Sequence, residues 1–103
     1  KVGGIYVSPF EVEGALLTHP DVLEAAVIGQ PDEDTLIKPK AYIVTKEGVT
    51  GNAALAEQLK QHVKSKLAPY KYPRWVEFAS ELPKTATGKI QRFKLRAKSQ
   101  AGK

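Results

Sequence analysis

The chain has 103 residues, 42% of them hydrophobic and 26% charged, so it can hold one modest core but neither a second core nor a deep, enclosed substrate cavity. It has no cysteine and no apolar run approaching the roughly 18 residues of a membrane span, which excludes disulfide, thiolate-zinc and catalytic-thiol chemistry and favours a cytoplasmic location. The net charge of +5 is unevenly distributed. Residues 1–59 contain four basic and nine acidic side chains and carry −5, whereas residues 60–103 contain twelve basic and two acidic side chains and carry +10. The second part of the chain therefore suits a polyanionic partner.

The first predicted helix follows a short β-rich segment. Residues 1–7 carry β-branched and aromatic side chains after a double glycine, which predicts a strand or hairpin. The segment Ser8-Pro9-Phe10-Glu11 then supplies an N-cap hydroxyl, a proline at the first helical position and a capping-box carboxylate. The helix has an apolar stripe and should end before His19-Pro20, because a residue that precedes proline avoids the α conformation; the stripe is Val12, Ala15 and Leu16.

Two β-rich runs come next, Val22–Gln30 and Pro39–Lys46, and the turn-forming residues between them predict neighbouring antiparallel strands. A second helix is predicted over residues 53–67, where leucine and valine recur at every fourth position. An alternating run over residues 74–78 predicts a third strand.

A basic helix is predicted over residues 92–98, followed by a frayed tail over residues 99–103. The predicted order of elements indicates an α+β domain, a small antiparallel sheet of about three strands plus an N-terminal hairpin, flanked by helices.

Metal and phosphate-loop chemistry have little support in this sequence. Asp32, Glu33 and Asp34 are consecutive carboxylates on a predicted turn, and such groups are usually solvated, so we assign no metal. Gly88-Lys89 is similar to the end of a phosphate-binding Walker loop, but that motif needs a glycine and a serine or threonine where this chain has Pro83 and Ile90.

The segment from Pro83 to Ile90 is therefore interpreted as a mobile, glycine-hinged loop in which Lys84 and Lys89 flank two threonines. Such a loop can bring an ammonium group onto a developing phosphate or carboxylate oxygen. A solvated loop before a basic helix is the simpler alternative, and the residues alone leave both open.

Three segments, residues 1–13, 67–71 and 82–90, resemble in order and spacing the C-terminal domain of the AMP-forming acyl- and aryl-CoA ligases, and the benzoate-CoA ligase branch most of all. The resemblance implies that residues 1–103 are one mobile C-terminal domain. In this family a carboxylic acid reacts with Mg-ATP to give an acyl-adenylate and pyrophosphate, and the thiol of coenzyme A then displaces AMP. The small domain rotates against its own N-terminal domain between the two steps.

The resemblance also implies roles for individual residues. Lys89 matches the lysine that serves adenylation, while Gly3 and Gly4 match the loop that lines the pantetheine tunnel for coenzyme A. The nucleotide end of coenzyme A would meet Tyr70 and Arg74. Supporting roles are implied for Lys1, Lys84 and Lys71, and Tyr72 is an equal alternative in the CoA-binding segment.

Other expectations follow from the same resemblance. Because the chain begins at Lys1 rather than at a methionine, we expect a fragment that is inactive without the large domain. Acetylation would erase the charge of Lys89, so a lysine acetyltransferase and a deacetylase are predicted partners.

Two alternatives stay open at this point. The small domain of a peptide synthetase or a luciferase-like enzyme would share these motifs. A basic nucleic-acid-binding module would explain the charge from Lys60 onward, although Phe93 is the only candidate for base stacking in the last helix.

Overall fold

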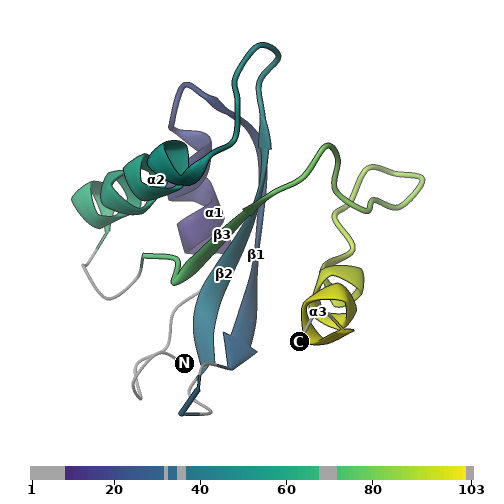
Figure 1. The fold of residues 1–103 in the computed structure, drawn as a ribbon. Helices are drawn as coiled ribbons and strands as arrows, with labels where there is room; N and C mark the ends of the chain where they lie inside the picture. Colours follow the sequence, from purple (N-terminus) through teal and green to yellow (C-terminus); the bar gives the residue numbers. More distant parts are fainter. Residues whose placement is uncertain (1–8, 32, 35–36, 68–71, 102–103) are drawn as a thin grey trace.

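A three-stranded sheet in the order β1-β2-β3 forms the centre of the fold (Figure 1). The structure, a computed structural model, describes residues 9–31, 33–34, 37–67 and 72–101. Strand β1 (Val22–Pro31) pairs antiparallel with β2 (Ile37–Thr45), which confirms the predicted pair of strands. The predicted N-terminal hairpin lies outside the described residues.

The third strand differs from the prediction in its direction. Strand β3 (Trp75–Phe78) runs parallel to β2, with Val76 opposite Ala41, so the sheet is mixed rather than antiparallel. Helix α2 (Ala53–Lys66) lies between β2 and β3 in the chain, and a helical crossover of this kind returns the chain to the end of the sheet where β2 began. The α+β class is confirmed, and the pairing of β3 is corrected.

Helices α1 (Pro9–Leu17) and α2 cover one face of the sheet (Figure 1). Because successive side chains of a strand point to opposite faces, alternate residues of β1 and β2 meet these helices. The apolar stripes predicted for both helices are confirmed as the larger core. Its buried members are Val12, Ala15, Leu16, Val22, Ala25, Val27, Ala41, Ile43, Leu55, Leu59 and Val63.

Helix α3 (Arg92–Ala101) and the chain that leads into it cover the other face. The second core there is smaller, because α3 contributes a single buried side chain among its described residues; its members are Ala26, Ile28, Tyr42, Val44, Leu82 and Leu95. The predicted fraying from residue 99 is wrong. The helix continues to Ala101, and residues 92–101 contain no glycine or proline that would end it earlier. Within the described parts of the chain, no helix has the length and apolar character of a membrane span.

Candidate functional site

Lys89 lies on a short closed loop between β3 and α3. The Thr85 N–H donates to the Lys89 carbonyl oxygen over 2.8 Å, and the Lys89 N–H donates back to the Thr85 hydroxyl over 3.1 Å. Gly88 has a φ of 86°, a left-handed conformation that favours glycine, and its N–H reaches the Thr85 carbonyl at 2.9 Å. The loop thus holds the backbone of Lys89 in place while its side chain stays exposed.

The base of the loop is anchored on the sheet. Lys84 and Ile90 form an antiparallel bridge, and the Gln91 N–H donates to the Pro83 carbonyl oxygen over 2.8 Å. Ile90 packs against the smaller core, and Leu82 just before the loop is buried. Gly88 thus closes a hydrogen-bonded turn within the loop, and the predicted mobility of the loop stays a prediction.

The two lysines of the loop differ in their surroundings. The Lys84 ammonium forms an ion pair with Glu24 of β1, so part of its charge is balanced within the domain. Among the residues that the structure describes, Lys89 has no acidic partner. Lys89 is thus the cation that this loop leaves available to an outside anion.

The start of α3 is tied to α1 by two residues that the sequence did not single out. The Arg92 guanidinium meets the Glu13 carboxylate at two points, Nη2 to Oε1 at 2.5 Å and Nε to Oε2 at 2.9 Å. The same carboxylate accepts the Val27 N–H over 2.8 Å. The available signal was Glu13 itself, a carboxylate on the buried side of an amphipathic helix, which requires a partner.

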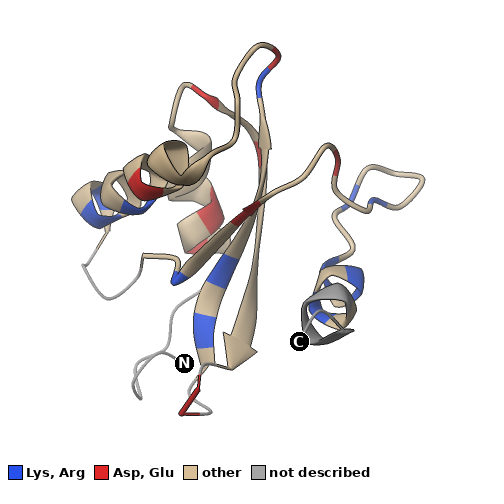
Figure 2. Ribbon diagram, viewed as in Figure 1, with Lys and Arg blue, Asp and Glu red and all other residues tan. Residues whose placement is uncertain are grey.

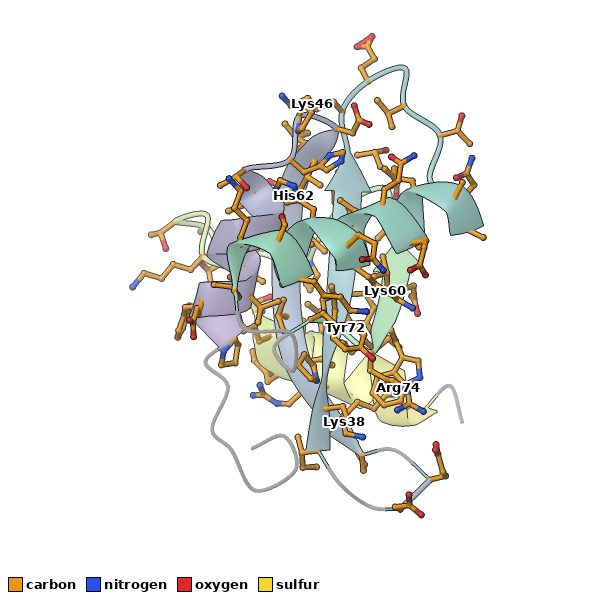
Figure 3. The ribbon with its side chains drawn as sticks, turned by 90° about the vertical axis from the view of Figure 1, so that its left-hand side faces the viewer. Lys38, Lys46, Lys60, His62, Tyr72 and Arg74 are labelled. Carbon is orange, nitrogen blue, oxygen red and sulfur yellow. The ribbon has the colours of Figure 1, made fainter. Side chains whose placement is uncertain are left out.

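Arg74 and Tyr72 lie on the other side of the molecule (Figure 3). The Arg74 N–H donates to the Pro39 carbonyl oxygen over 2.9 Å, which fixes the start of β3. Its guanidinium pairs with Glu33 at 3.3 Å and lies 5.8 Å from the centre of the Trp75 ring. Arg74 is therefore not simply solvated, because its guanidinium has an acidic and an aromatic neighbour within the domain.

Other cations and aromatic side chains gather near Arg74. The Lys64 ammonium lies 4.3 Å from the centre of the Tyr72 ring, and Figure 3 shows Lys60 and Lys38 on the same side. The remaining residues predicted for coenzyme A lie outside the described residues; they are Lys1, Gly3, Gly4, Tyr70 and Lys71.

The arrangement provides two separate basic surfaces. One holds Lys89 and continues along the basic helix α3, and the other holds Arg74 beside α2 (Figures 2 and 3). In the described ranges, no three histidine or acidic side chains come together as metal ligands would. An exposed ammonium on such a loop can stabilise negative charge that develops on a neighbouring group.

The comparisons with known proteins agree on one family. Residues 11–89, more than half of the chain, match the model of the AMP-binding enzyme C-terminal domain. The benzoate–CoA ligase of Thauera aromatica is 69% identical over 97 residues, which are 94% of this chain and 18% of that enzyme. The 4-hydroxybenzoate–CoA/benzoate–CoA ligase of Rhodopseudomonas palustris is 54% identical over 103 residues, which are 99% of this chain and 19% of that enzyme.

A solved structure, the anthranilate CoA ligase AuaEII in complex with anthranoyl-AMP, matches 95% of this chain and 19% of its own, with 60% identity and a TM-score of 0.89. The chain thus spans less than a fifth of the length of these relatives. The matching segment includes the Lys89 loop, in agreement with the motifs of the sequence. The chain belongs to the family of AMP-binding enzyme C-terminal domains.

Proposed function

We propose that residues 1–103 form the mobile C-terminal domain of an ATP-dependent, AMP-forming ligase that joins a carboxylic acid, benzoate or another aryl acid, to coenzyme A. The names of the relatives support an aryl acid as the substrate and coenzyme A as the thiol that accepts the acyl group. One observation carries the proposal: Lys89 is exposed on a hydrogen-bonded loop and has no acidic partner among the described residues. Such an ammonium is available to an anion outside this domain, such as a carboxylate or a phosphate.

In the first step, a carboxylate oxygen of the acid attacks the α-phosphorus of ATP, and the bond from that phosphorus to the bridging oxygen of pyrophosphate breaks. Both reactants are anions and repel each other. The Lys89 ammonium, placed between the carboxylate and the α-phosphate, would align them and stabilise the charge of the transition state. The resemblance implies that the N-terminal domain would bind most of the Mg²⁺ that accompanies ATP, and the described residues contain no cluster of three histidine or acidic side chains.

In the second step, the CoA thiol loses its proton and attacks the acyl carbon, and AMP leaves. After rotation of the domain, Gly3 and Gly4 would line the pantetheine tunnel, because a backbone without Cβ atoms permits close approach of the thiol arm. Tyr70 and Arg74 would contact the nucleotide end of coenzyme A, with Lys1 and Lys71 in supporting roles. Arg74 lies at the start of β3, whereas Lys89 lies on the loop between β3 and α3, and this separation supports a separate pose for each step.

The alternatives gain less support. The relatives named above carry CoA ligase names, which favours coenzyme A over the acceptors of peptide synthetases and luciferases. A nucleic-acid-binding role has little support in the basic helix, because Phe93 is the one exposed aromatic side chain on the described part of α3. The cytoplasmic location stays a prediction.

The test replaces Lys89 in the full-length ligase. Because the ammonium acts in the first step, Lys89→Ala should lower adenylation, measured as ATP–pyrophosphate exchange, by at least about 100-fold. Thioester formation from supplied acyl-adenylate should stay near the unmodified rate. Lys94→Ala, which removes another exposed lysine from α3, is the matched control and should change neither step.

Equal loss in both steps after Lys89→Ala would contradict the role. The same assays test regulation by modification. Enzymatic acetylation of Lys89 removes its charge and should reproduce the selective loss of adenylation. This result is expected if a lysine acetyltransferase and a deacetylase regulate the enzyme through Lys89. A fully acetylated enzyme with normal exchange would exclude that regulation.

A further inference from the structure

We propose that Glu13 and Arg92 are positioning residues for Lys89: their ion pair fixes the first turn of α3, and with it the loop that carries the adenylation lysine, against α1 and β1. The inference rests on the function proposed above, because it assigns to the pair an effect on adenylation that passes through Lys89.

The pair joins three elements at the outer side of β1. Among the described residues, β1 pairs with β2 alone, and the Val27 N–H donates to a side-chain acceptor rather than to another strand. Helix α1 covers one face of the sheet and α3 covers the other. The Glu13 carboxylate of α1 accepts the Val27 N–H and two hydrogen bonds from the Arg92 guanidinium of α3. A two-point guanidinium–carboxylate pair fixes orientation as well as distance.

Both charges of the pair are largely removed from water. Glu13 is 7% exposed as a residue, and the Arg92 side chain is 23% exposed and lies over the Phe10 ring with 4.6 Å to its centre. A desolvated ion pair is stable only when hydrogen bonds satisfy it, and here three short contacts do so. Removal of one partner would leave the other charge buried and unpaired.

Apolar packing alone provides little to hold the start of α3 in place. Among the described side chains of the helix, Leu95 is buried, whereas Phe93, Lys94 and Arg96 are exposed. One buried leucine fixes the distance of the helix from the sheet but leaves rotation about that contact open. The ion pair supplies a second attachment, one turn earlier in the helix, and restricts the rotation.

The attachment acts on Lys89 over a very short stretch of chain. Only Ile90 and Gln91 lie between Lys89 and Arg92, and the three steps of chain from Lys89 to Arg92 span at most about 10 Å when extended. The stretch is further restrained, because Ile90 is bridged to Lys84 and the Gln91 N–H is bonded to Pro83. A displacement of Arg92 therefore displaces the loop that carries Lys89, because the restrained segment between them cannot adjust.

The test combines variants of the full-length ligase. Arg92→Ala and Glu13→Gln should lower pyrophosphate exchange about 10- to 100-fold, the loss expected when a reacting group is misplaced by about 1 Å. Thioester formation from supplied acyl-adenylate and the KM for ATP should stay unchanged. Arg96→Ala, which removes an exposed arginine from the next turn, is the control and should affect neither step.

A double-mutant cycle identifies the route of the effect. In a Lys89→Ala background, Arg92→Ala should cause no further loss of exchange, since the group that it positions is gone. If Arg92→Ala fails to fold, Arg92→Lys replaces it in the cycle; this variant keeps the charge but loses the two-point contact, and an intermediate loss is expected.

The outcomes separate the inference from the function on which it rests. Normal exchange after Lys89→Ala would overturn the proposed function itself. A selective loss after Lys89→Ala, together with normal exchange after Arg92→Ala and Arg92→Lys, would overturn the positioning role alone. Losses that are equal in both half-reactions, or that multiply with Lys89→Ala, would show a purely structural pair and would also overturn it.

Discussion

Gly88 and Gly48 share one backbone conformation, and only Gly88 lies next to Lys89. Their φ values are 86° and 85°, and a Cβ atom at either position would meet no atom within 4 Å. Replacement by alanine therefore introduces conformational strain without a clash, at a cost of about 1–2 kcal/mol. Gly48 follows β2, far along the chain from the loop, and serves as the matched position.

We predict that Gly88→Ala and Gly48→Ala lower the free energy of unfolding by similar amounts, measured by urea denaturation of the 103-residue chain. In the full-length ligase, Gly88→Ala should also slow pyrophosphate exchange, because the turn that holds the backbone of Lys89 opens. Gly48→Ala should leave exchange at its normal rate. Similar exchange rates in the two variants would mean that the closed turn does not position the lysine.

At the scale of elements, α2 offers a test of stability that leaves the Lys89 loop intact. The Asn52 side chain caps this helix and accepts the Leu55 N–H over 2.9 Å. Asn52→Ala should lower the free energy of unfolding by about 0.5–2 kcal/mol, whereas Asn52→Asp keeps an acceptor and should cost much less. Both are measured by urea denaturation of the chain.

Pyrophosphate exchange by the full-length Asn52→Ala ligase should stay normal below its unfolding temperature, since α2 and the Lys89 loop lie on opposite faces of the sheet. A slowed exchange in this variant would mean that general loosening of the domain impairs adenylation. It would weaken every assignment that depends on selective loss.

Local patterns predict the helices and the first two strands, because their signals are contained in a few consecutive residues. The apolar spacing of α1 and α2 and the alternation of β1 and β2 required no knowledge of distant contacts. The direction of β3 is different, since it depends on how the α2 crossover packs. The Glu13–Arg92 pair joins residues 79 positions apart, and no local pattern specifies such a pair.

At the scale of the whole molecule, the uneven charge of the sequence has an internal explanation as well as an external one. Within the described part of the chain, three ion pairs join an acidic residue of the first 59 positions to a basic residue of the remainder; they are Glu13–Arg92, Glu24–Lys84 and Glu33–Arg74. Part of the basic excess therefore holds the fold together. Lys89 is left outside these pairs, so the motif, rather than the net charge, singles out Lys89 as the candidate.

The contact between α1 and α2 makes the stability of the whole domain depend on pH. His62 of α2 lies against His19, with ring centres 5.1 Å apart, and its Nε2 is 2.6 Å from the Thr18 hydroxyl. Burial, His19 and Lys66 lower the pKa of His62 below its usual 6.5, while a hydrogen bond to Ala15 opposes them. The Nδ1 atom of His19 accepts the Asp21 N–H over 3.1 Å.

The sign of the effect follows from proton linkage. Since the folded chain binds the His62 proton more weakly than the unfolded chain, stability is fully present above about pH 6.5 and is lost as the pH falls through the lowered pKa. We predict that the Tm of the chain falls from about pH 8 to about pH 5, and that His62→Gln, which keeps a hydrogen-bonding group, loses less over the same range. Carboxylates titrate in both proteins, so the difference between the two curves isolates the histidine. Parallel curves would show that the histidine contact does not link folding to pH.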